Sequence, residues 1–279
     1  MLFQLKTKDQ KNKEDQRNSP KIDKLKSMFD KVKFVAKNVI YVKKWSENTL
    51  QTNILVSNPS AKTNNGRHLN IKQGSFLIKI IKDSDKLMQK VKKLRQKSFF
   101  TKSTDKEFDS DEFDKYCDHL VVIDRSISDD FVVGTYRLLL KPKFLKNQRF
   151  YSQSEFDISS LINYKKSTLL EAGRSCVHEK YRDGRIIKLL WRGLATYIVN
   201  NQVELIFGCA SFPSRNYKLF SKQLSYLHHY HITPEKLNTF PHKNLKANFR
   251  LVDKNLIHTE DEFRKLPPLI KAYLRVGAW

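Results

Sequence analysis

The pattern of apolar and polar positions changes near residue 70. Residues 1 to about 70 are polar and mostly non-periodic, with one helical pattern around 24–42. Such a segment has too little apolar surface to pay for its own ordering. From residue 75 onward, apolar positions recur at the spacings of strands and helices. We therefore expect a basic, largely disordered or partly helical extension over 1–70 and a folded domain over 75–279.

Within the folded part, short apolar runs bounded by turn residues predict strands. The expected strands cover residues 76–81, 119–124, 131–140, 169–177 and 205–210. The polar turn 126–130 joins the second and third of these strands, which indicates an antiparallel hairpin.

Three stretches show helical spacing instead. The first places Leu87, Met88, Val91 and Leu94 on one face and can be capped by Ser84 or Asp85. The others cover 186–198 and 217–227. A strand, a turn, a long helix and a strand form a βαβ unit, here attached to an antiparallel hairpin. The expected fold class is therefore α/β or α+β, with a mixed central sheet flanked by helices.

The formal net charge of +24 indicates attraction to an anionic partner. Nucleic acid, anionic lipid headgroups and an acidic protein all fit this charge, and so does a surface of solvated lysines without a partner. No apolar stretch is long enough to span a bilayer, and the start lacks the apolar region of a secretory signal. The cysteines Cys117, Cys176 and Cys209 form no CxxC pair, which favours a reducing, cytoplasmic setting without disulfides or a bound metal.

A basic turn carries the first sign of chemistry. A predicted strand ends near Val177 and a predicted helix begins after Gly184. The free N–H groups at a helix start suit a phosphate, and Arg182 and Arg185 add positive charge. A single glycine in a basic turn is common, so this signal is weak by itself.

Several segments, taken together and in order, resemble the acyl-carrier-protein-dependent L-ornithine N(alpha)-acyltransferases, which make lyso-ornithine lipid on the GNAT fold. The matching segments are residues 117–122, 134–139, 150–152, 155–157, 171–194, 207–212 and 267–274. The resemblance covers most of residues 76–279. It implies an acyl carrier protein as donor, L-ornithine as acceptor and no bound cofactor beyond the donor's phosphopantetheine thioester.

The chain also resembles the acyl-homoserine-lactone synthases, a related branch of the same fold. Their arginine four residues before a phenylalanine matches Arg95 and Phe99, and their glutamate three before an arginine matches Glu171 and Arg174. The arginine on the next strand matches Arg137. Their acidic pair before the first central strand corresponds to Asp114 and Asp118, with imperfect spacing.

The resemblance assigns roles to these residues, each with a structural alternative. Glu171 is the candidate base or amine anchor, and its alternative is a carboxylate paired with Arg174 or Arg137. The two arginines are expected to organise the cleft. A backbone N–H near Ser175, Cys176 or Val177 would stabilise the thioester oxygen.

The donor's phosphate is expected at Arg182, Gly184 and Arg185, in a turn without the fuller glycine-rich loop of acetyl-CoA users. A covalent intermediate on Cys176 is not needed for direct transfer.

Five residues are candidates for substrate binding: Arg95, Phe99, Asp114, Asp118 and Phe212. Arg95 could dock the acidic carrier protein or be an exposed structural arginine. Asp114 and Asp118 could bind the acceptor's second amine or cap a loop. Phe212 is a core residue or lines the acyl tunnel.

Two rival functions remain, acyl-homoserine-lactone synthase and a basic nucleic-acid-binding protein. Residues 207–212 match the ornithine branch better, and no nucleic-acid-binding module is recognisable, so no nucleic acid is expected. The lysine-rich extension is expected to hold the protein near an anionic membrane, peripherally at the inner membrane. Related proteins continue past the position of Trp279 into a final strand, so an edge strand is expected to be missing here.

Overall fold

The computed structural model describes residues 2–4, 68–100, 107–141, 149–164, 168–214, 216–247, 250–275 and 277–279. The helix expected around residues 24–42 lies outside these residues. The chain separates into two compact units. The first comprises residues 1–33, 142–169 and 204–279, and the second comprises residues 34–141 and 170–203.

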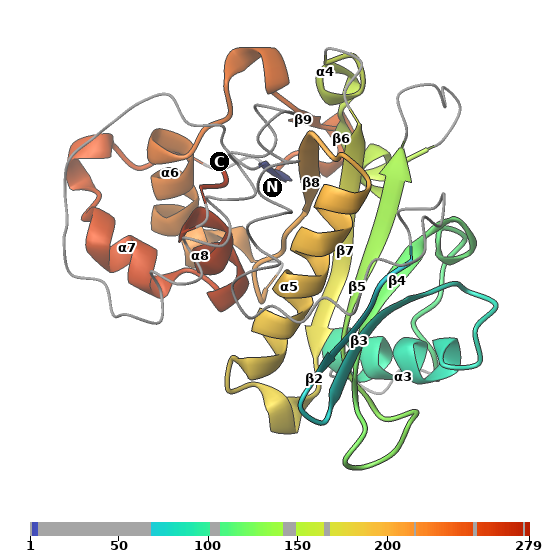
Figure 1. The fold of residues 1–279 in the computed structure, drawn as a ribbon. Coiled ribbons are helices and arrows are strands. Elements are labelled where there is room, and N and C mark those ends of the chain that lie inside the picture. Colours follow the sequence, from blue (N-terminus) through green and yellow to red (C-terminus); the bar gives the residue numbers. More distant parts are fainter. Residues whose placement is uncertain are drawn as a thin grey trace, which may run out of the picture. The chain divides into compact units, whose positions relative to one another are not determined.

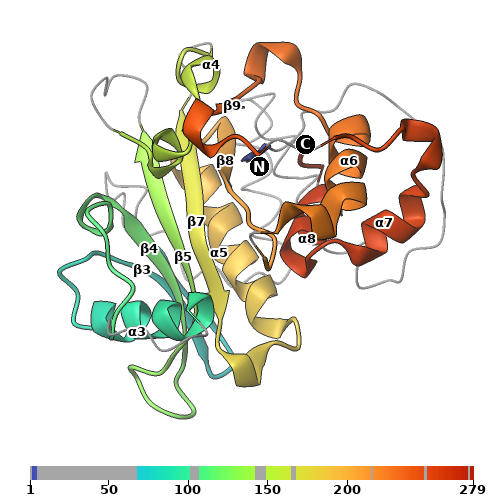
Figure 2. The ribbon, with the colours of Figure 1, turned by 180° about the vertical axis from the view of Figure 1, so that it is seen from behind.

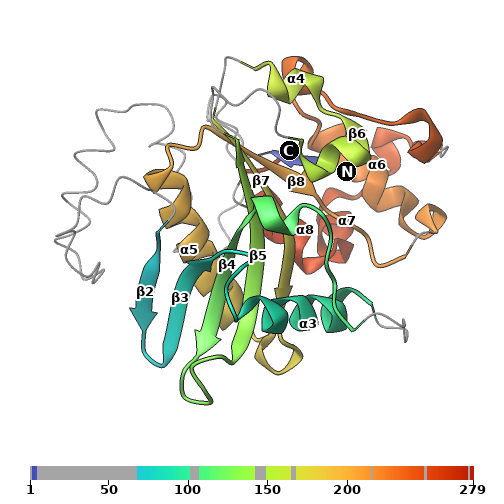
Figure 3. The ribbon, with the colours of Figure 1, turned by 90° about the vertical axis from the view of Figure 1, so that its right-hand side faces the viewer.

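The second unit contains a sheet with the strand order β7-β5-β4-β3-β2. Its strands are β2 (Asn70–Gln73), β3 (Phe76–Ile81), β4 (Asp118–Asp124), β5 (Val132–Lys141) and β7 (Leu169–Val177), of which β7 begins one residue before the boundary between the units. Strands β2 to β5 pair antiparallel in sequence order, and Figure 3 shows them side by side. The expected hairpin of β4 and β5 is confirmed, as are the strands expected over 76–81 and 169–177.

Two helices cover this sheet, α3 (Met88–Phe99) on one face and α5 (Arg185–Asn200) on the other (Figures 1 and 2). The alternation along β4 explains the two layers, because successive side chains of a strand point to opposite faces. Val121 packs with Val91 of α3, whereas Leu120 lies under Gly193 of α5. The expected sheet with flanking helices is thereby confirmed.

The helical patterns have the expected faces. Leu87, Met88, Val91 and Leu94 are all buried in one cluster. The expected cap is only partly right, because α3 begins at Met88 and neither Ser84 nor Asp85 occupies its N-cap. Asp85 instead accepts a hydrogen bond from the Leu87 N–H at 2.9 Å, just before the helix.

The sequence did not predict β2. It forms a hairpin with β3 through the two residues that follow Gln73, and Gly74 takes the left-handed φ of +58° that such a turn needs. The strand is short and largely exposed, so its apolar alternation is too weak to stand out.

The first unit holds two short strand pairs and most of the remaining helices. β1 (Leu2–Gln4) pairs antiparallel with β8 (Leu205–Cys209), and β6 (Phe156–Asp157) pairs with β9 (Phe240–Pro241). The sequence assigned residues 2–4 to the extension and did not predict β1. In this structure the strand gives β8 an antiparallel neighbour.

The helices of the first unit are α4 (Ser159–Ile162), α6 (Ser221–Tyr230), α7 (Thr259–Lys265) and α8 (Pro268–Arg275). Single 3-10 turns in the two units are η1 (Asp114–Tyr116), η2 (Tyr151–Ser154), η3 (Glu179–Tyr181), η4 (Tyr217–Phe220), η5 (Glu235–Leu237), η6 (Lys243–Leu245) and η7 (Lys254–Leu256). Apolar residues of α6 and α8, among them Leu227 and Ile270, share a buried cluster with Leu266 and Ile257. Among the residues that the structure describes, none of the helices combines the length and apolar character needed to cross a bilayer.

Replacing Gly193 with alanine should destabilise the protein. Alanine is the better helix former by about 1 kcal/mol, but a Cβ here would lie 2.7 Å from Leu120 and 2.8 Å from Ile78. Overpacking of this kind costs about 1–3 kcal/mol, so we expect a net loss of roughly 1 kcal/mol in urea unfolding. Lys188→Ala, on the exposed side of the same helix, is the control and should be near neutral. A Gly193→Ala protein as stable as this control would contradict the tight contact.

Candidate active site

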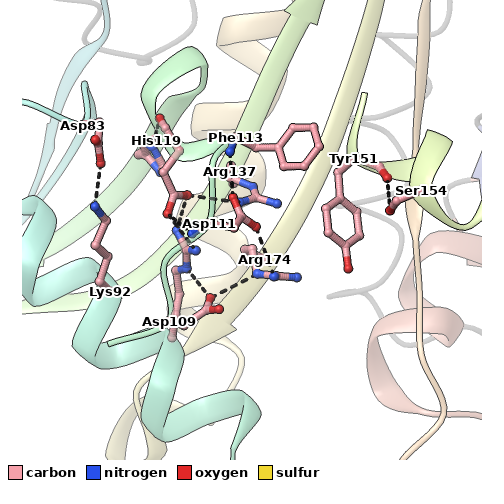
Figure 4. Close-up of polar contacts among 12 residues, drawn as sticks. Asp83, Lys92, Asp109, Asp111, Phe113, His119, Arg137, Tyr151, Ser154 and Arg174 are labelled. Atoms are coloured by element: carbon pink, nitrogen blue, oxygen red, sulfur yellow. Dashed lines mark hydrogen bonds and ion pairs between the residues drawn. The ribbon is translucent and has the colours of Figure 1, made fainter. Parts of the chain in front are cut away.

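Three arginines and three aspartates form ion pairs beside α3, β5 and β7 in the second unit. Figure 4 labels Asp109, Asp111, Arg137 and Arg174 among them. We call these six residues the arginine–aspartate cluster: Arg95, Arg137, Arg174, Asp109, Asp111 and Asp114. Each arginine comes from a different element, and all three aspartates come from the connection between α3 and β4. The cluster therefore ties this connection to the helix and to two strands.

Every arginine in the cluster contacts two aspartates. Arg95 Nε donates to Asp109 at 2.6 Å, and its Nη1 donates to Asp114 at 2.8 Å. Arg137 Nη1 donates to Asp111 at 2.6 Å and to Asp114 at 3.1 Å. Arg174 contacts Asp109 at 3.1 Å through Nε and Asp111 at 3.3 Å through Nη2. The contacts form a closed ring in which charges alternate in sign.

Burial makes the inner part of this ring electrostatically strong. The Arg95 side chain is 0% exposed and that of Asp114 is 2% exposed. Burial by itself raises the pKa of Asp114, but the hydrogen bonds and charges of Arg95 and Arg137 outweigh it and lower the pKa to about 2. Burial lowers the pKa of Arg137, and Asp111 more than compensates, so that pKa is raised. Asp114 and Arg137 are thus both ionised at neutral pH.

Glu171 is buried on β7, three residues before Arg174. Its charge acts on the Cys117 thiol together with those of Arg137 and Asp114, while burial is the main cause that raises the pKa of Cys117 to about 12. Glu171 therefore lies within electrostatic reach of the cluster. A buried carboxylate close to the cluster fits both expected roles, an amine anchor and a structural partner, and the role of base stays a prediction.

The backbone of β7 is irregular at Arg174, whose φ is +50°. Non-glycine residues rarely adopt this left-handed conformation, which costs about 1–3 kcal/mol and persists only where the surroundings enforce it. The ion pairs to Asp109 and Asp111 hold the side chain, and the Phe99 ring lies 5.9 Å from its guanidinium carbon. The irregularity directly precedes Ser175, Cys176 and Val177, the segment expected to supply a donor for the thioester oxygen. That role stays a prediction.

Cys176 is a core residue. It packs in the apolar cluster around Val91 and Val121, and burial raises the pKa of its thiol to about 12. A thiol with this pKa is protonated at neutral pH and is a poor nucleophile. This agrees with the expectation of direct transfer without a cysteine-bound intermediate.

The basic turn before α5 is exposed. Gly184 forms its N-cap with a left-handed φ of +90°, a conformation that glycine adopts without strain. Arg182 Nε donates to the Val177 carbonyl at 3.1 Å, whereas Arg185 pairs with Asp183 at 2.7 Å. Asp183 also accepts the Arg185 N–H, so a phosphate at this helix start would compete with its carboxylate. Phosphate binding here stays a prediction.

The structure separates Asp114 from Asp118, which the sequence had placed together as a pair for the acceptor's second amine. Asp118 accepts a hydrogen bond from Tyr197 of α5 at 2.6 Å and pairs with Lys82. Asp114 contacts Arg95 of α3, on the opposite face of the sheet. A joint site for these two carboxylates is therefore wrong.

One further substrate-binding expectation changes, the one for Arg95. Arg95 cannot dock a carrier protein, because its side chain is wholly buried, and its place in the cluster makes it a structural residue. Phe212 lies in the other unit, where it is partly buried and stacks on Phe220 with ring centroids 4.8 Å apart. This packing agrees with the expectation of a core residue. Phe99 is 44% exposed and remains a candidate next to Arg174.

Sequence reasoning missed Asp109 and Asp111. A usable signal was present, since residues 107–114 carry five acidic side chains in a chain with a large excess of lysine. Those acids follow a helix that carries a buried arginine, and charged residues are almost never fully buried unless they are paired.

Arg174→Gly and Arg174→Ala should separate backbone strain from lost ion pairs. Both variants remove the same contacts, but only glycine accepts the φ of +50° freely. We expect the glycine variant to be more stable than the alanine variant by about 1 kcal/mol in urea unfolding. At Ser175, which lacks a positive φ, the same pair of changes should give the opposite order. An alanine variant at 174 that is the more stable one would refute the strain.

Acid should destabilise the protein through Asp114. Its folded-state pKa of about 2 lies below the ordinary value of 3.8, so the unfolded chain takes up the proton first. The stabilisation is complete at pH values well above 3.8 and is lost as the pH falls toward 2. A shift of this size corresponds to about 2 kcal/mol. The free energy of unfolding, measured by urea titration at pH values from neutral to about 3, should fall as the pH is lowered. In the Asp114→Asn variant this fall should be smaller, because the contribution of Asp114 is absent.

The comparisons with known proteins agree with this geometry. Residues 94–192 match the acetyltransferase (GNAT) domain family. The chain is 40% identical over 174 residues to an L-ornithine N(alpha)-acyltransferase of Agrobacterium fabrum (strain C58), a match that covers 61% of this chain and 59% of that protein. Enzymes of the same name from Rhodobacter capsulatus and Rhizobium meliloti are 38% and 37% identical over 61% of this chain, with 66% and 59% of their own lengths covered.

The chain thus spans between 59% and 66% of the length of the curated relatives that it matches. The GNAT match begins in α3, runs through β4, β5 and β7, and ends within α5, and so contains the whole arginine–aspartate cluster. The domain match and the sheet with a helix on each face together confirm that this part of the chain has the GNAT fold that the sequence led us to expect.

Proposed function

We propose that this protein transfers a fatty acyl group from an acyl carrier protein to the α-amine of L-ornithine. The main support is the similarity to four L-ornithine N(alpha)-acyltransferases, at 36–40% identity over 61% of the chain. The product would be lyso-ornithine lipid, the first intermediate of ornithine lipid synthesis. These relatives are enzymes that act on ornithine, which favours ornithine over the acceptor of a lactone synthase.

In the proposed reaction, the neutral α-amine attacks the carbonyl carbon of the acyl thioester. The ammonium form has no lone pair, so a base must first accept a proton, and Glu171 takes this role. The new C–N bond forms as the C–S bond breaks, and the carrier's phosphopantetheine leaves as a thiolate, which takes the proton that the attacking nitrogen loses on becoming an amide. Backbone N–H groups near Ser175, Cys176 and Val177 stabilise the negative charge that develops on the carbonyl oxygen.

The basic turn before α5 supports a carrier-protein donor. Arg182 and Arg185 are exposed beside Gly184 and can meet the phosphate of the phosphopantetheine arm. The turn lacks the additional glycines with which acetyl-CoA users surround a pyrophosphate, and this favours a carrier-protein donor. A strongly basic chain also suits an acidic carrier protein.

The lipid product suggests a membrane nearby. We propose that the lysines of residues 1–70 hold the protein at an anionic bilayer surface, where each lysine close to the surface contributes about 1 kcal/mol. Nearly all of that segment lies outside the described residues.

Glu171→Gln should abolish most of the transfer. Purified protein is incubated with 3-hydroxyacyl carrier protein and ornithine, and acyl-ornithine is measured by mass spectrometry. Loss of a general base lowers the rate by about 10²- to 10⁴-fold. The matched control is Glu179→Gln, an exposed glutamate just after the same strand, which should keep near-normal activity. Full activity of the Glu171→Gln variant would rule out Glu171 as the base. Absence of acyl-ornithine with the unmodified protein would rule out the proposed reaction.

A further inference from the structure

The arginine–aspartate cluster has one closed end and one open end. At the closed end, the side chains of Arg95, Asp109 and Asp114 are 0%, 6% and 2% exposed. At the open end, those of Asp111 and Arg174 are 23% and 24% exposed. The side chain of Arg137 is only 5% exposed. A small ligand in solution can therefore reach Asp111 and Arg174 directly, and it reaches Arg137 once Asp111 moves away.

The Asp111 side chain lies between Arg137 and Arg174 in the position that the carboxylate of a ligand could take. One oxygen accepts from Arg137 Nη1 at 2.6 Å and the other accepts from Arg174 Nη2 at 3.3 Å. Two guanidinium groups that each donate a charge-assisted hydrogen bond to one oxygen of a carboxylate form a binding site for that carboxylate and fix its orientation. In Figure 4, Asp111 lies between these two arginines and comes from a connecting segment instead of a helix or strand.

Withdrawal of Asp111 would leave the rest of the cluster paired. Arg137 would keep Asp114 at 3.1 Å, and Arg174 would keep Asp109 at 3.1 Å. Arg137 and Arg174 would each have lost one charged hydrogen-bond acceptor. One ligand carboxylate replaces both lost hydrogen bonds. Withdrawal of Asp109 or Asp114 would instead break a buried contact of Arg95, whose side chain has no exposure to water.

We propose that the gap between Arg137 and Arg174 is the binding site for the carboxylate of an amino-acid acceptor, and that Asp111 is an internal occupant which the acceptor displaces. This inference rests on the proposed function and names the part of the acceptor that is recognised. The buried Glu171 on the same strand as Arg174 would then meet the α-amine, which lies one carbon away from the carboxylate.

An internal competitor also provides selectivity. A tethered carboxylate acts at a high effective concentration, so a simple carboxylate displaces it poorly. An α-amino acid can offset this competition through its amine, whereas a diamine without a carboxylate gains nothing from the arginine pair. The site therefore selects for a molecule that carries both groups.

Asp111→Asn tests the proposal, because it keeps the size of the side chain and removes the competing charge. Binding to the full chain without donor is measured by calorimetry for three probes: ornithine, propionate, and 1,4-diaminobutane, which is ornithine without its carboxylate. We expect ornithine and propionate to bind about tenfold more tightly to Asp111→Asn than to the unmodified protein, since a charged hydrogen-bond competitor is gone. Diaminobutane binding should not change.

Asp129→Asn is the control, since Asp129 pairs with Arg125 in an exposed turn away from the cluster. It should leave the binding of all three probes unaltered. Thermal melting of each variant establishes that it is folded, and if Asp111→Asn fails to fold, Asp111→Ser takes its place with the same expected pattern.

The outcomes distinguish this inference from the proposed function. Weaker binding of ornithine and diaminobutane alike in Asp111→Asn would make Asp111 an ammonium ligand and overturn the inference, and unchanged binding of both carboxylates would overturn it as well. Either result leaves acyl transfer to ornithine intact. Tighter propionate binding in Asp111→Asn, in a protein that never acylates ornithine, would uphold the carboxylate site and reject ornithine as acceptor.

Discussion

The burial of Arg95 is the constraint on which the rest of the site depends. A guanidinium with no exposure to water is tolerated only with carboxylates in contact, and Asp109 and Asp114 supply them at 2.6 and 2.8 Å. Both acids belong to residues 107–117, which precede β4, so this segment must lie against α3. Once it does, Asp111 is carried to the two remaining arginines. The geometry of the candidate site thus follows from the need of the buried Arg95 for carboxylate partners.

The same cluster links packing to the proposed chemistry. Its ion pairs hold Arg174 in a strained backbone conformation, directly before the residues proposed to stabilise the thioester oxygen. A preorganised donor is effective because it need not reorient during the reaction. Buried ion pairs stabilise the folded state only modestly, because the loss of hydration of the charged groups offsets much of their mutual attraction. Their main contribution here is the fixed position of β7.

Much of the second unit could be predicted from sequence because its elements are regular. The strand over residues 169–177 and the faces of α3 and α5 follow from apolar spacing, which reflects burial directly. The roles of Asp109 and Asp111 could not be predicted in the same way, since spacing does not reveal the path of an irregular connection. Asp114 and Asp118 were paired wrongly because β4 begins at Asp118 and directs that side chain to the other face.

The link between Asp111 and Arg174 also bears on how the chain folds during synthesis. The two residues are 63 positions apart. At ribosomal rates of about 5–20 residues per second, the arginine emerges roughly 3–13 s after the aspartate. During that interval the antiparallel strands β2 to β5 can pair, while the acidic connection still lacks one of its three guanidinium partners. The arrival of β7 completes the ring of charges, so the nascent domain acquires its final acidic-loop conformation only when its later strand is available.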